Sequence, residues 1–112
     1  MAHGDLIVSN QRSSHIKLID AAVGTTDGVW VDTIDYENGS IEITLTTSGT
    51  VQICGSNSPT RPLDSANGTQ IGNDFTTQTL QCIDRLPRWL KARVTAVSGA
   101  LSVLTVLRKQ AQ

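Results

Sequence analysis

Hydrophobic and polar residues alternate along much of this chain with a period of two, the pattern of a strand with one buried face. The clearest example is residues 41–46, where isoleucine and leucine alternate with glutamate and threonine. Turn signals such as Asn38-Gly39 and Ser98-Gly99 separate the alternating runs about every ten residues. The pattern predicts about seven or eight short strands, within residues 15–19, 29–34, 41–46, 50–53, 69–71, 75–83, 88–97 and 101–107.

Short strands at this spacing, with no helical period, are typical of sandwiches, barrels and jelly rolls. The chain has 112 residues, enough for one domain with one core. Only 4% of the residues are aromatic, so the core must be built from valine, isoleucine and leucine. We therefore predict an all-β fold, a single antiparallel β-sandwich or jelly roll over residues 15–112.

Residues 1–14 stand apart from this pattern. They contain one apolar cluster, Leu6-Ile7-Val8, in a polar stretch with no partner strand close by in the sequence. One interpretation is a frayed terminus. The other is an extended arm that adds the apolar cluster to the surface or sheet edge of another subunit. We treat residues 1–14 as an N-terminal arm, and Leu6, Ile7 and Val8 as candidate partner contacts.

The longest stretch without a strand pattern is residues 55–68. Pro59, Pro62 and many glycine, serine and asparagine residues exclude regular structure there. A loop of this length in so small a domain is more often functional than accidental. Arg61 is the basic residue of this loop and a candidate partner contact.

Charge is segregated along the chain. Residues 1–84 carry all 10 acidic groups and three basic ones, whereas residues 85–112 carry six basic groups and no acidic one. Either the two sets neutralise each other on neighbouring strands, or they form a charged patch that meets a partner of opposite sign. Nucleic acid is a poor candidate for that partner, because Lys91 and Arg93 lack interleaved aromatic residues that would stack on bases.

The predicted strand at 88–97 carries the most distinctive side chains. Trp89, Lys91 and Arg93 alternate with apolar residues and are expected on the opposite, exposed face. Tryptophan and arginine are enriched at subunit interfaces, which makes these three residues candidate partner contacts. The alternatives for Trp30 and Trp89 are packing in the core or use as a sugar-binding platform.

No set of residues has the composition of an active site. His15 begins a polar, alternating strand and is typical of a surface histidine. Asp32, Asp35 and Glu37 lie at a strand end and turn, where carboxylates form local hydrogen bonds. Cys82 follows an apolar pattern and is expected to be buried, and two cysteines with distant histidines are too few for a metal site. We predict no catalytic residues, no cofactor and no metal, and no apolar run is long enough to span a membrane.

Three stretches resemble a known class of proteins. They are residues 28–32 (GVWVD), residues 51–57 (VQICGSN) and residues 86–94 (LPRWLKARV), the last leading to a Ser-Gly turn and a final apolar strand. This layout resembles small β-sandwich virion proteins of tailed bacteriophages, in particular the cement or decoration proteins of the phage head.

The resemblance implies a jelly-roll-like domain that binds the outside of a capsid and clamps neighbouring copies of the major capsid protein. The expected partners are the major capsid protein and the protein itself, as a homodimer or homotrimer, with no nucleic acid and no membrane. The expected location is the capsid surface of the virion, after synthesis in the host cytoplasm. The alternative function is a carbohydrate- or receptor-binding module of a tail fibre or baseplate.

Overall fold

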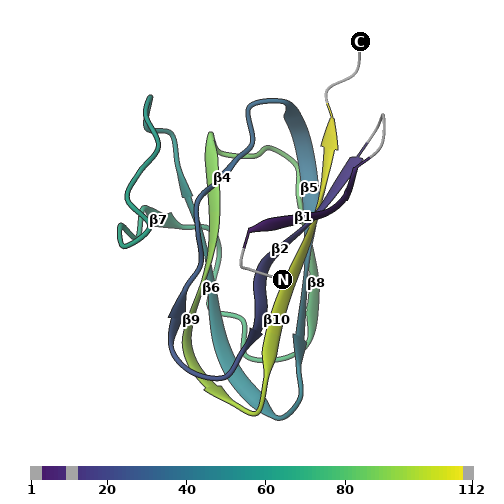
Figure 1. Ribbon diagram of the computed structural model, residues 1–112, viewed down its shortest axis with the longest axis vertical. Helices are drawn as coiled ribbons and strands as arrows, with labels where there is room; N and C mark the ends of the chain where they lie inside the picture. Colours follow the sequence, from purple (N-terminus) through teal and green to yellow (C-terminus); the bar gives the residue numbers. More distant parts are fainter. Residues whose placement is uncertain (1–3, 10–12, 110–112) are drawn as a thin grey trace.

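Two antiparallel β-sheets pack face to face across an aliphatic core (Figure 1). The computed structural model describes residues 4–9 and 13–109, and this part of the chain contains no helix. Sheet A has the strand order β1-β2-β10-β5-β8. Sheet B has the order β3-β9-β6-β7, and β4 also pairs with β9. The strands are β1 (Asp5–Ser9), β2 (Ser13–Ala22), β3 (Thr26–Asp27), β4 (Val31–Asp32), β5 (Tyr36–Leu45), β6 (Ser48–Ser56), β7 (Thr69–Gln70), β8 (Thr79–Ile83), β9 (Trp89–Ser98) and β10 (Leu101–Lys109).

This architecture confirms the predicted fold class, an all-β antiparallel sandwich. The described residues form ten strands, more than the seven or eight expected. The two additional strands are β1, which lies in the expected arm, and the two-residue strand β3, which lies between the predicted strands at 15–19 and 29–34. Of the strand predicted over 29–34, only Val31–Asp32 pairs with β9.

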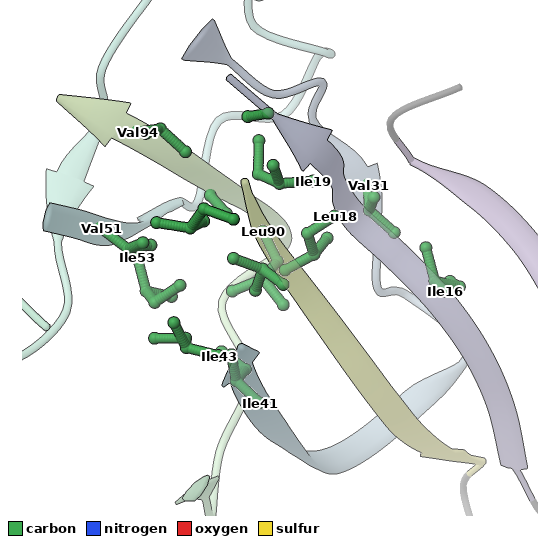
Figure 2. Packing of buried hydrophobic residues seen from close by; sticks show 14 of the residues in the cluster. Ile16, Leu18, Ile19, Val31, Ile41, Ile43, Val51, Ile53, Leu90 and Val94 are labelled. Carbon is green, nitrogen blue, oxygen red and sulfur yellow. The ribbon is translucent and has the colours of Figure 1, made fainter. Parts of the chain in front are cut away.

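The core lies between the inner faces of the two sheets (Figure 2). Strands with a buried face send alternate side chains into this space, except in β2, where the adjacent residues Leu18 and Ile19 are both buried beside a register shift in the pairing with β10. The fully buried members of the cluster are aliphatic, as the low aromatic content predicts. They include Leu18, Ile19, Ile41, Ile43, Leu101 and Val103 from sheet A, and Val51, Ile53, Leu90 and Val94 from sheet B, each at most 1% exposed.

The two glycine turn signals have different outcomes. Ser98-Gly99 lies at the predicted turn between β9 and β10, and Gly99 has a φ of +83°. Asn38-Gly39 instead lies inside β5 and pairs with β10. A Cβ atom at Gly39 would lie 2.8 Å from the carbonyl oxygen of Val106, so this glycine permits a close strand contact rather than a turn.

The N-terminal segment, predicted as an arm of residues 1–14 before a domain that begins at residue 15, contributes strand β1 to sheet A. Strand β1 pairs antiparallel with β2, and β2 itself begins at Ser13. Ser14 is buried, and its hydroxyl accepts a hydrogen bond of 2.8 Å from the Tyr36 hydroxyl. Pairing with β2 gives backbone donors and acceptors of this segment partners within the fold.

We predict that alanine substitution at two isoleucines, one in the core and one outside it, has very different effects on the free energy of unfolding. Ile43 is 1% exposed, whereas Ile34 is 57% exposed on a loop. We expect Ile43→Ala to lower the free energy of unfolding by about 2–5 kcal/mol, because it removes buried methyl groups and leaves a cavity. The matched control Ile34→Ala should change it by no more than about 0.5 kcal/mol. Chemical denaturation monitored by circular dichroism measures both values, and equal effects would contradict the assignment of the core.

Candidate partner-binding loop

The loop of residues 57–68 joins β6 to β7 and covers the outer face of sheet B. Beneath it lies a second buried cluster, formed by Trp30, Cys54 and Trp89. The indole N–H of Trp30 donates to the carbonyl oxygen of Leu63 (2.9 Å), and the indole N–H of Trp89 donates to that of Ser58 (3.1 Å). Each tryptophan therefore packs under the loop and also anchors its backbone.

Lys91 is the strongest of these anchors. Its side chain is fully buried, and Nζ donates to the carbonyl oxygens of Asp64 (2.8 Å) and Ala66 (2.7 Å). The carboxylate of Asp27 lies 3.8 Å from Nζ, and the ring centroid of Trp30 lies 5.1 Å from it. A buried ammonium group is tolerated only when its N–H donors have acceptors and its charge is balanced. Here the two carbonyl oxygens accept its hydrogen bonds, and the Asp27 carboxylate and the face of the Trp30 ring balance its charge.

This burial corrects the expectation that Trp89 and Lys91 lie on an exposed face of β9. Their alternation with apolar residues places them on the outer face of sheet B, as predicted. That face is not free, because the 57–68 loop folds back over it. Trp89 is 7% exposed and Lys91 is 0% exposed, so neither side chain presents a surface to a partner.

The loop also contains its own local structure. The amide of Ala66 donates to the carbonyl oxygen of Leu63 (2.9 Å), which closes a turn. Gly68 ends the loop with a φ of +58°, and a Cβ atom there would lie 2.7 Å from the ring of Trp30. Both features require glycine at this position. The loop is therefore fitted to the tryptophan that it covers.

Two side chains in the middle of the loop, those of Arg61 and Leu63, are exposed to solvent. Leu63 is 77% exposed although its carbonyl oxygen is held by Trp30. Arg61 is exposed and forms a salt bridge of 2.9 Å with Asp64, whose own carbonyl oxygen is held by Lys91. The backbone is thus fixed from below while an apolar and a charged side chain remain accessible.

Arg93 lies partly exposed beside this cluster. Its guanidinium donates to Asp27 (2.9 Å) and to the side-chain oxygen of Gln52 (3.4 Å). Arg88 forms a salt bridge with Asp32 on β4. Three basic residues of the C-terminal quarter, Arg88, Lys91 and Arg93, therefore meet acidic residues of β3 and β4 within sheet B. The sequence allowed two interpretations of the charge pattern, neutralisation between neighbouring strands or a charged patch for a partner. These contacts support the first.

The N-terminal candidates lie apart from the loop. Leu6 and Ile7 are 55% and 40% exposed on β1, at the edge of sheet A, whereas the loop covers sheet B. Val8 pairs through its backbone with His15, and its side chain lies outside the described part of the structure. The structure brings Arg61, Trp89, Lys91 and Arg93 to one region, and it leaves Leu6 and Ile7 as a second, separate surface.

The cysteines also differ from expectation. Cys82 is exposed on β8, and the buried thiol is that of Cys54. Burial raises the pKa of the Cys54 thiol, with nearby Lys91 and Arg93 acting in the opposite direction. Within residues 4–9 and 13–109, no group of three or more histidine, cysteine or acidic residues could hold a metal ion, and no helix is long and apolar enough to cross a membrane.

Fold and loop together define a small two-sheet antiparallel sandwich with one long, anchored loop on sheet B. No protein-family model matches the sequence, and no curated protein matches it. Among solved structures, the crystal structure of SPBc2 prophage-derived protein YomS is similar, with a TM-score of 0.67 and 13% sequence identity. The match covers 92% of this chain and 99% of that chain. At this identity the likeness establishes a shared fold.

Lys91 should control the order of the loop. Lys91→Met keeps the length of the side chain but removes the donors to Asp64 and Ala66. We expect faster amide hydrogen exchange across residues 57–68 and a loss of about 1–3 kcal/mol in the free energy of unfolding, because two carbonyl groups of the loop lose the charged donor that holds them.

The matched control is Lys17→Met, which removes a lysine whose side chain is partly exposed and pairs with Asp20. This variant should leave hydrogen exchange in the loop unchanged. Identical exchange in the loops of wild type and Lys91→Met would show that the buried ammonium does not hold the loop.

Proposed function

We propose that this protein is a structural component of a bacteriophage virion, without enzymatic activity, that binds the outside of the capsid. In this role it cements neighbouring subunits of the major capsid protein. Two findings support the proposal. The fold is similar to that of a prophage-derived protein, and the 57–68 loop presents accessible side chains on a fixed backbone.

The anchored loop is the observation that carries this proposal. A binding loop that is already ordered loses little conformational entropy when a partner docks. Leu63 supplies an apolar group that can enter a pocket, and Arg61 supplies a planar charge for a carboxylate. Arg61 already pairs with Asp64 in the exposed middle of the loop, and such an exposed pair holds the side chain only weakly.

Cementing follows from mass action. A protein that binds the assembled shell more tightly than free capsid subunits shifts the equilibrium toward the shell. Many copies on one shell add their effects, so each contact can be modest. A stiff sandwich with a preformed loop suits this role, since it transmits force between neighbours without first having to fold.

The alternative function, a carbohydrate-binding module, was expected to use Trp30 or Trp89 as an exposed platform, and neither side chain is exposed. A sugar ring stacks on an exposed aromatic face, but Trp30 is 3% exposed and Trp89 is 7% exposed. The loop covers both indoles and uses both N–H groups internally. The contacts of these two tryptophans therefore favour the capsid-binding proposal over a glycan site built on them.

The proposal predicts that a charge at position 63 of the loop weakens binding. Leu63→Asp should reduce binding at least about tenfold, because it places a charge where an apolar anchor docks. Binding is measured by cosedimentation of the purified protein with capsids that lack it, prepared from the virus that encodes it. The matched control is Val23→Asp, since Val23 is also 77% exposed and lies on another loop.

Two results would count against the proposal. Failure of the wild-type protein to sediment with these capsids would overturn the cementing function. Equal binding of wild type, Leu63→Asp and Val23→Asp would remove the 57–68 loop as the contact.

A further inference from the structure

The edges of the two sheets are protected to different degrees. An exposed strand edge offers unpaired backbone groups to another chain, and proteins limit this by shortening, bulging or charging such strands. In sheet B, the outer strands β3, β4 and β7 have two residues each. In sheet A, β1 contains a register shift between Leu6 and Val8.

Strand β8 has none of these protections. Its five residues, Thr79–Ile83, include no charged residue and no proline. It pairs with β5 in continuous register from Ile43 to Gly39, without a bulge. Within the described residues β8 is the last strand of sheet A, so its other edge pairs with no strand there.

Strand β8 also exposes apolar side chains. Leu80 is 68% exposed, and Cys82 is exposed. Next to β8 the two sheets are not fully packed together. A cavity of about 440 Å³ lies there. Its lining is partly apolar, with Ile41, Ile53, Ile71, Phe75 and Ile83, and also includes the polar residues Asn73, Gln81 and Asp84. The flank of the sandwich beside β8 is therefore open.

We propose that β8 pairs antiparallel with β8 of a second copy of this chain, about a two-fold axis at Gln81. This register sets Leu80 opposite Cys82 of the partner subunit and Thr79 opposite Ile83 of the partner subunit. Sheet A then continues across the dimer, the exposed Leu80 gains a neighbour, and the open flank is extended by another sandwich.

The absence of charge on β8 favours a second copy of this chain as the partner of its unpaired edge. Like charges directly opposite each other destabilise a strand pair, and self-pairing sets every residue near the axis against its own neighbours. Strand β8 is neutral, so it meets no repulsion. The first charged residues beyond it, Asp84 and Arg85, fall opposite Gln78 and Thr77 of the partner subunit. The strand is therefore self-complementary, and this inference does not depend on the proposed function.

A disulfide tests the register directly. Opposite residues in an antiparallel pair have Cα atoms about 4.5–5.5 Å apart, within the range that a disulfide spans. Oxidation of Leu80→Cys should therefore give a covalent dimer, because the new thiol faces Cys82 of the partner subunit. The double variant Leu80→Cys, Cys82→Ser should give none, and neither should the wild-type protein.

Sedimentation velocity over a range of concentrations measures the dimer itself. The wild-type protein should dimerise, and Gln81→Lys should raise the dissociation constant at least about tenfold, because two like charges meet at the axis. Thr44→Lys, an exposed position on β5, is the matched control and should leave the dimer unchanged. A wild-type protein that stays monomeric would overturn the inference. A dimer in which Leu80→Cys forms no disulfide would also overturn it. The disulfide test decides the register even if the Gln81→Lys variant does not fold.

Discussion

Lys91 places an ammonium group where solvent does not reach it, and the 57–68 loop supplies the two carbonyl oxygens that this group needs. A buried cation without partners is costly, so Lys91 can remain buried only while the loop is closed over it. The loop in turn has no strand ladder over most of its length, and its carbonyl groups depend on Lys91 and the two indoles. Loop and sheet therefore order together.

Strand β9 connects this interaction to the rest of the molecule. Its inner side chains, including Leu90 and Val94, fill the aliphatic core, and its outer side chains hold the loop. A substitution in the core that shifts β9 would therefore also shift the side chains that hold the loop. The loop covers sheet B, whereas the neutral edge strand β8 belongs to sheet A. Binding to a partner and pairing with a second copy would consequently use separate surfaces.

The alternation of residues was sufficient to predict the sheets and the aliphatic core, because a period of two reports directly on one buried face. It was not sufficient for β9, where Trp89, Lys91 and Arg93 have the pattern of a solvated face. What buries the first two is a loop distant in sequence, and nothing local signals that contact. The length and proline content of the loop did mark it as unusual. However, Asp64 and Ala66 accept the hydrogen bonds of Lys91 through backbone oxygens, which any residue carries.

These contacts require the 57–68 loop to be as ordered as the strands that it covers. Backbone ¹⁵N relaxation of the free protein measures this directly. We predict order parameters for the non-proline residues of the loop close to the value of about 0.85 typical of rigid backbone, and similar to those of β9. Values below about 0.6 across the loop, with rigid strands beside it, would show that Lys91 and the two indoles do not hold the loop.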